Sequence, residues 1–286
     1  MTDIRSAHPT EQAARVASRV LVPVDGSQPS TAALPVAVAL AAELGVPVEI
    51  LDCFPPAVPP GAELDWLRGQ GTKVGVDVSD DAVRPTLDVA GEILAAVARH
   101  TGTIVCMASH GRTAVGELLY GSTTHDVVAS SPTPVVVVGP HAQVPDTFTT
   151  MQVCLDGSPT SRRALDVAAA WAKALHAVPW LTQVVEPPDL DPDLGASGDV
   201  VEGAMLGRHA HDPRFAGLEV EWDVLHGRHV ADALARWATE HDAGLLVASS
   251  HGRSGLQRMR LGSVTARLIH EATCPVLVVG PAVPTT

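Results

Sequence analysis

Short apolar runs alternate with longer segments of helical character, and this alternation fills both halves of the chain. In the first half the apolar runs predict strands at residues 20–24, 46–53, 73–78, 103–108 and 134–138. The segments between them predict helices at 32–44, 87–100 and 122–130. Pro35 lies inside the first helix and predicts a kink or a later start, and the proline- and glycine-rich residues 54–61 predict a loop.

The second half repeats this order of elements. Strands are predicted at 152–155, 178–184, 218–225, 245–249 and 275–279, and helices at 161–175, 230–241 and 264–271. Short Val- and Leu-rich strands that alternate with helices are typical of parallel sheets with helices on both faces. We therefore expect the α/β class, as two tandem doubly wound domains, each with a mostly parallel five-stranded sheet.

The repetition extends to individual motifs. Ser-His-Gly-Arg at 109–112 returns at 250–253, and each copy is followed by a Gly-Ser pair, at 121–122 and 262–263. Asp-Gly-Ser at 25–27 returns with an offset of 131 (156 − 25), whereas the last strand returns with an offset of 141 (275 − 134). The ten additional residues (141 − 131) are expected within 187–212. Residues 1–18 predict a tail, 19–143 the first domain and 150–286 the second.

Composition narrows the class of protein. Of 286 residues, 46% are hydrophobic and 3% aromatic, and no apolar run approaches the ~20 residues that a membrane span requires. Residues 1–18 lack an apolar signal-peptide core, and the four cysteines form no C-x-x-C motif. These features predict a cytoplasmic protein without membrane contact. The net charge of −13 argues against nucleic acid as a partner.

Candidate ligand-binding residues cluster where strands end, the usual ligand edge of such sheets. Asp25 and Asp156 end the first strand of each half, and Asp52 and Gln183 lie near the end of the second. The Gly-Ser pairs precede predicted helices, whose free N–H groups favour phosphate. Gly111 and Gly252 would allow a ligand close to the backbone.

Each of these signals also has a purely structural interpretation. Gly-Ser before a helix can be a turn with a serine cap, and aspartate in Asp-Gly-Ser can form an Asx turn. His110 and His251 can act as general bases or make structural hydrogen bonds. Arg112 and Arg253 can pair with phosphate, face solvent or make a contact between the halves. A role of Arg258 and Arg260 would be confined to the second half.

Taken together, the motifs resemble the universal stress protein family. Its domains have Asp-Gly-Ser after the first strand, a G-x2-G-x9-G-(S/T) signature in ATP-binding members, and a last strand like Pro-Val-x-Val-Val. The resemblance covers residues 19–140 and 150–281 and implies an adenine nucleotide alpha-hydrolase-like fold. It also implies ATP, with or without Mg²⁺, as the ligand.

The family's binding roles can be carried over to both halves. The first-strand aspartate contacts adenosine, a residue near the end of the second strand packs on the base, and the glycine signature surrounds the phosphates. In the first half the candidates are Val24, Asp25, Cys53, Ala108, His110, Gly111, Gly121, Ser122 and Thr123. In the second half they are Leu155, Asp156, Val184, Ser249, His251, Gly252, Gly262, Ser263 and Val264.

One position departs from the family pattern in both halves. Ala108 and Ser249 stand where the signature has its first glycine. If this position requires only a small residue, both suffice. If it requires a positive φ, either costs about 1 kcal/mol and weakens nucleotide binding.

The sequence leaves three functions open. An adenine-nucleotide-binding regulatory protein agrees with the retained Gly-x9-Gly-Ser, and a nucleotide-independent stress or scaffold protein agrees with the substituted glycine. An adenylate-forming enzyme is the third. The chain contains no P-loop, no G-x-S-x-G and no H-E-x-x-H, and the acidic residues 189–193 predict a solvated loop rather than a metal site.

Assembly is also suggested by the resemblance, because the family pairs domains through the last strand. Residues 135–138 and 276–279 are apolar edge candidates that require cover. We expect them to pair with each other and make an internal pseudo-dimer. A homodimer through other surfaces and an unidentified regulatory protein partner remain open.

Overall fold

The fold is described from a computed structural model of the protein. The structure describes residues 16–56, 60–79, 82–109, 121–185, 192–251 and 261–284. Most of the predicted tail, both loops that follow Ser-His, and residues 189–191 of the acidic segment lie outside these ranges.

The first half contains five strands. In chain order its elements are β1 (Arg19–Val24), η2 (Pro29–Ala32), α2 (Ala33–Leu44), β2 (Val48–Phe54), α3 (Pro60–Val74), β3 (Val83–Pro85), α4 (Val89–Arg99), β4 (Thr103–Ala108), α5 (Ser122–Ser130) and β5 (Val135–Val138).

The second half repeats this order. Its elements are β6 (Thr150–Leu155), α6 (Arg163–Leu175), β7 (Val178–Val185), α7 (Pro192–Ala210), η3 (Pro213–Phe215), β8 (Glu221–His226), α8 (Val230–Glu240), β9 (Leu245–Ser249), α9 (Ser263–Glu271) and β10 (Val276–Val279).

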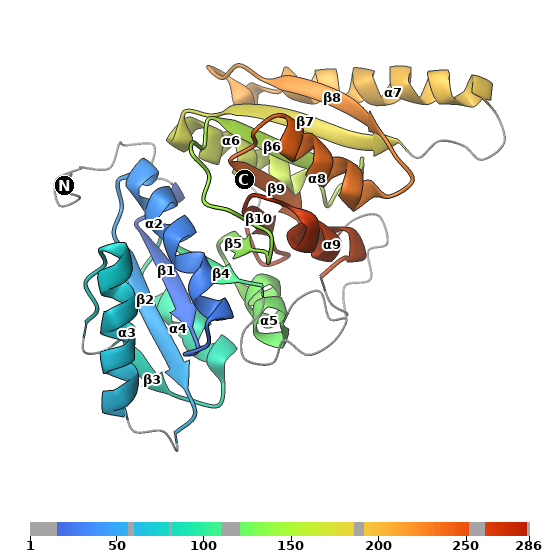
Figure 1. Ribbon diagram of the computed structural model, residues 1–286. Coiled ribbons are helices and arrows are strands. Elements are labelled where there is room, and N and C mark those ends of the chain that lie inside the picture. Colours follow the sequence, from blue (N-terminus) through green and yellow to red (C-terminus); the bar gives the residue numbers. More distant parts are fainter. Residues whose placement is uncertain are drawn as a thin grey trace.

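All ten strands form one sheet, in the order β3-β2-β1-β4-β5-β10-β9-β6-β7-β8. Within each half every pairing is parallel. The halves meet where β5 and β10 pair antiparallel, with Leu277 opposite Val136 (Figure 1). The predicted α/β fold is therefore confirmed, and the two last strands pair with each other as expected.

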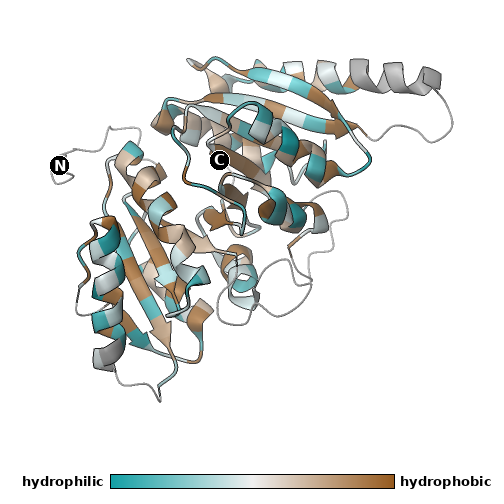
Figure 2. Ribbon diagram, in the orientation of Figure 1, coloured by the Kyte–Doolittle hydropathy of each residue, from teal (hydrophilic) through white to brown (hydrophobic). Residues whose placement is uncertain are grey.

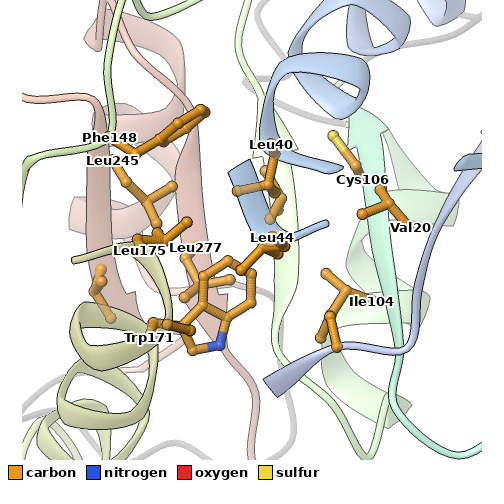
Figure 3. Packing of buried hydrophobic residues seen from close by; sticks show 14 of the residues in the cluster. Val20, Leu40, Leu44, Ile104, Cys106, Phe148, Trp171, Leu175, Leu245 and Leu277 are labelled. Atoms are coloured by element: carbon orange, nitrogen blue, oxygen red, sulfur yellow. The ribbon is translucent and has the colours of Figure 1, made fainter. Parts of the chain in front are cut away.

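Helices cover both faces of the sheet. Buried residues of α2, α6 and the described parts of α3 and α7 form one hydrophobic cluster, and those of α4, α5, α8 and α9 form the other. The central strands β5 and β10 are wholly apolar and buried, whereas the outer strand β8 carries hydrophilic colour, as does the side of α8 that faces away from the sheet (Figure 2). In the first cluster, Leu40 and Leu44 of α2 lie opposite Trp171 and Leu175 of α6 (Figure 3). Each cluster thus continues from one half into the other.

Two glycines allow the halves to approach closely. A Cβ at Gly139, just after β5, would overlap the carbonyl oxygen of Ile269 in α9. A Cβ at Gly280, just after β10, would overlap the carbonyl oxygen of Val128 in α5. The two contacts are equivalent by the repeat, so both sides of the junction depend on the absence of a side chain.

Several predictions about the two connections between β1 and β3 were wrong. Residues 73–78 do not form a strand, because α3 continues to Val74 and the third strand is β3. The loop expected at 54–61 ends where α3 begins at Pro60. Pro35 does not delay α2, because it lies in the first helical turn, where its missing N–H is not needed.

The additional residues of the second half lie between β7 and β8. Asp52 pairs with Val83 and Gln183 pairs with Val224, so the offset changes from 131 to 141 within this connection. It contains α7, which the sequence did not predict, followed by η3.

Candidate functional site

The Asp-Gly-Ser motif forms the same turn in both halves. Asp25 Oδ1 accepts hydrogen bonds from the Ser27 N–H at 3.0 Å and from the Ser27 hydroxyl at 2.6 Å. Asp156 Oδ1 accepts one from the Ser158 N–H at 2.9 Å. Gly26 and Gly157 have φ values of 75° and 79°, which favour glycine. The Asx-turn interpretation is therefore correct for both aspartates, and this turn holds the carboxylates at the ends of β1 and β6.

Each Gly-Ser pair starts a helix, and its glycine is hydrogen-bonded to the residue that follows the preceding strand. The Gly121 N–H donates to the Ser109 carbonyl at 2.8 Å, and the Gly262 N–H donates to the Ser250 carbonyl at 2.7 Å. In the described part of the chain, glycine is the N-cap of α5 and of α9, and neither helix start has a side-chain cap. The serine-cap interpretation is therefore wrong, because each serine is the first helical residue.

The third helical residue fixes the helix start against the preceding strand. The Thr265 hydroxyl donates to the Ser249 carbonyl at 2.8 Å, and the Thr124 hydroxyl lies 3.3 Å from the Ala108 carbonyl. The first-turn N–H groups of α5 and α9 are consequently held beside the ends of β4 and β9. Such groups, together with the helix dipole, favour an anion.

The described residues give no reason for glycine at position 121. Its φ is −77°, which any residue adopts, and the nearest described atom to an added Cβ would be the Ser109 carbonyl oxygen at 3.6 Å, an ordinary contact. A ligand that approaches the backbone closely is a remaining physical reason for glycine at this position.

The two departures from the family signature carry no backbone strain. Ala108 pairs with Val138 inside β4, and Ser249 pairs with Val279 inside β9. Among the described non-glycine residues, only His176 and Asp242 have a positive φ. Because both positions are extended strand, alanine and serine fit them at no conformational cost.

A cavity of about 600 Å³ opens at this edge of the second half. It lies over the carboxyl ends of β6, β7 and β9 and beside the start of α9. Its lining includes seven of the predicted site residues: Leu155, Asp156, Val184, Ser249, Gly262, Ser263 and Val264.

Known proteins match this architecture along almost the whole chain. The profile of the universal stress protein family matches twice, at residues 17–139 and 147–280. The chain belongs to the universal stress protein family. A universal stress protein of Mycolicibacterium smegmatis is 28% identical, over 92% of this chain and 97% of its own length. Rv2005c of Mycobacterium tuberculosis is 30% identical, over 91% and 96%.

Solved structures agree with the fold of this tandem universal stress protein. The structure of a universal stress protein from Archaeoglobus fulgidus superposes with a TM-score of 0.65 at 23% identity, over 92% of this chain and 98% of its own. No helix in the described ranges combines the length and the apolar character that a membrane span requires.

The remaining predicted residues of the second half do not belong to the described cavity lining. His251 lies next to it, and its Nδ1 is 3.0 Å from the Ser250 hydroxyl, in agreement with a structural role. Gly252 and Arg253 lie outside the described residues, as do Arg258 and Arg260.

The first domain has the same frame with different side chains. Val24, Asp25, Cys53, Ala108, Gly121, Ser122 and Thr123 lie at the ends of β1, β2 and β4 and the start of α5. His110, Gly111 and Arg112 lie outside the described residues. Burial, followed by the carboxylates of Asp52 and Glu92, raises the pKa of Cys53 to about 12, so this thiol stays protonated and unreactive at neutral pH.

The cavity also contains polar residues that the sequence analysis did not select, notably Ser161, Gln183 and Glu202. Gln183 was recognised only as lying near a strand end. Ser161 closes the Asx turn, since its hydroxyl donates to the Ser158 carbonyl at 3.0 Å. Glu202 belongs to α7, and no pattern in the sequence indicated that this helix would reach the site.

Proposed function

We propose that this tandem universal stress protein is a regulatory protein that binds an adenine nucleotide, with ATP as the main candidate and Mg²⁺ as its counterion. The observation that carries the proposal is the cavity of the second domain. It brings Asp156 and the Gly262-Ser263 helix start to one space at the carboxyl edge of the sheet.

The order of the strands suggests how a nucleotide would lie. The start of α9 follows β9, Asp156 follows β6, and Val184 lies at the end of β7; these three strands are neighbours. Adjacent strands are about 4.8 Å apart, so β9 and β7 are separated by roughly 10 Å. Phosphate at α9, ribose near Asp156 and base near Val184 would fill this span.

The first domain supports the same proposal through Gly121. Neither its backbone conformation nor its packing against the described residues explains this glycine. The helix start beside it has a glycine N-cap and no capping side chain among the described residues. A phosphate oxygen accepting from the N–H groups of Ser122 and Thr123 would satisfy these donors.

A regulatory role fits these features better than a catalytic one. A nucleotide bound in this cavity would contact both α7 and the start of α9. Binding would favour one arrangement of the surface around the cavity, which a protein partner can recognise. In the alternative, scaffold function, a protein partner would recognise the same surface without any bound nucleotide.

The test begins with the ligand itself. Gently purified protein is denatured, the released small molecules are identified by mass spectrometry, and the melting temperature is measured in millimolar ATP with and without Mg²⁺. We expect a released adenine nucleotide and a higher melting temperature with ATP. Absence of both would contradict the proposal and favour the scaffold function.

A double variant, Gly121→Val with Gly262→Val, tests the phosphate assignment. Valine at both positions would occupy the space next to the helix starts and abolish ATP binding in calorimetry. Each single variant serves as a control, because it should halve the number of sites. The urea midpoint of Gly121→Val should stay close to wild type, since a Cβ at Gly121 makes an ordinary contact with the Ser109 carbonyl oxygen. Retained affinity in the double variant would refute the assignment.

A further inference from the structure

Two buried hydrogen-bond acceptors of the second-domain cavity have no partner among the described residues. Gln183 is 1% exposed, and its Oε1 accepts no hydrogen bond from a described residue. Glu202 Oε2 is enclosed and likewise accepts none within the described ranges. Both residues line the cavity. Because buried acceptors are normally satisfied, two such atoms at one cavity indicate a ligand that donates hydrogen bonds there.

Both acceptors lie far from the proposed phosphate end. Gln183 is at the carboxyl end of β7, and Glu202 lies on α7, which packs on β7 and β8. The strand β6 with Asp156 separates them from β9 and the α9 start. They would therefore meet the end of a nucleotide that is opposite its phosphates.

We infer that Gln183 and Glu202 determine the base specificity of this site by reading the exocyclic amine of adenine. This rests on the proposed nucleotide binding. The amide of glutamine pairs with the N6 amine and N7 of adenine, accepting from the first and donating to the second. The carboxylate of Glu202 accepts the other N6 hydrogen. Guanine and hypoxanthine have an oxygen at this position. This oxygen is itself an acceptor, so it cannot donate to the two acceptors Gln183 Oε1 and Glu202 Oε2.

The first domain has a different residue at the equivalent place. Asp52 corresponds to Gln183 by the repeat and is 0% exposed. An ionised carboxylate only accepts hydrogen bonds and cannot form the two-sided pair of a glutamine amide. The adenine preference is therefore assigned to the second domain.

The experiment compares ATP with ITP, which differs by an oxygen in place of the amine. Calorimetric titration of the full chain should give at least about a tenfold preference for ATP at the tighter site. Gln183→Met and Glu202→Met remove the acceptors with little change in size, and each should lower this preference about threefold or more. Glu202→Gln keeps an acceptor oxygen and should retain most of it.

Controls separate the possible failures. Glu221→Met makes the same charge change at the opposite end of β8, outside the cavity lining, and should leave the preference unchanged. Both cavity methionine variants should unfold at the wild-type urea midpoint or above it, because they remove unsatisfied acceptors. Equal binding of ATP and ITP, or a preference unchanged by both variants, would overturn the inference alone. Equal losses in Glu202→Gln and Glu202→Met would also overturn it. Absence of ATP binding would overturn the proposed function as well.

Discussion

The two domains share their framework residue for residue, but the far ends of their sites differ. Both have the Asx turn with a positive-φ glycine, the glycine N-cap and a junction glycine that contacts the other domain's helix. At the end of the second strand, the first domain has Asp52-Cys53-Phe54, and the corresponding residues of the second domain are Gln183-Val184-Val185.

This difference distinguishes the residues that the fold requires from the residues that are free to differ between the two proposed sites. The turn, the helix start and the junction are constrained by backbone geometry, so both copies keep the same solution. The side chains at the ends of β2 and β7 are different in character, since the buried carboxylate of Asp52 corresponds to the buried amide of Gln183. We therefore expect the domains to respond equally to changes in the framework and unequally to changes at the strand-two end.

The largest effect should come from the junction. Gly139→Ala and Gly280→Ala would each force a Cβ into a backbone carbonyl of the opposite domain, at Ile269 and Val128. We expect each to reduce the free energy of unfolding by about 3 kcal/mol, measured by urea denaturation. Gly121→Ala, with room for its Cβ, should change it by less than about 0.5 kcal/mol.

The same variants test whether the domains unfold together. Trp66 reports on the first domain, whereas Trp180, Trp222 and Trp237 report on the second; Trp171 packs at the junction opposite α2 and reports on both. Because both hydrophobic clusters cross the junction, the wild type should show one transition for both sets of probes. The junction variants should separate the transitions, and a wild type with two separate transitions would contradict the shared core.

Alkaline pH should lower the free energy of unfolding through Cys53, near the end of β2 in the first domain. The pKa of Cys53 is raised to about 12 by burial and by neighbouring carboxylates, above the value of 9.0 for an unburied thiol. The unfolded chain therefore loses this proton first, and stability is lost as pH rises from 9 towards 12. Cys53→Val, which copies Val184, should remove about 1.4 kcal/mol of this loss at pH 10.

The measurement is the urea-unfolding free energy of both proteins at several pH values. Below pH 8 the wild type and Cys53→Val should have parallel pH dependence, which serves as the internal control. Identical slopes between pH 9 and 11 would show that Cys53 is not buried as described.

Smaller and equal effects are expected from the Asx turns. Asp25→Ala and Asp156→Ala each remove acceptors for the N–H at the next serine. Each should cost about 1 kcal/mol of unfolding free energy, with the two values within about 0.5 kcal/mol of each other. A loss confined to one domain would show that the turns are not equivalent.

The smallest effect should be specific to the longer connection of the second domain. Arg214, in η3, donates to Asp166 of α6 at 2.7 Å and to Asp212 at 2.9 Å. Arg214→Met should cost about 0.5 kcal/mol, because partly exposed ion pairs contribute little. Arg208→Met, at an exposed arginine of α7 in the same connection, should cost less in the same urea assay.

Sequence patterns were most reliable where a segment is buried on both sides. The strands β4 and β9 have the predicted ends, because a glycine precedes each apolar run and a serine follows it. The helices α3 and α7 were missed since both contain several glycines, which lower helix propensity. Leu67 and Leu206 are fully buried in them, so packing outweighs the local preference.

The site was likewise predictable where local sequence patterns decide the structure and not where tertiary packing does. Residues next to strand ends and helix starts could be placed from the repeat, and seven of them share the cavity of the second domain. Glu202 could not, because its position depends on where an unpredicted helix packs against β7 and β8. Side chains that reach a site from a crossover helix require tertiary structure for their identification.

The antiparallel pairing of β5 with β10 has a consequence for concentration. Two separate domains that met through this edge would dissociate on dilution, as any bimolecular complex does. Here a short connection, from Val138 to Thr150, keeps the two edges together at a high effective concentration. The junction is therefore insensitive to the amount of protein in the cell, and β3 and β8 are the outermost of the described strands of the sheet.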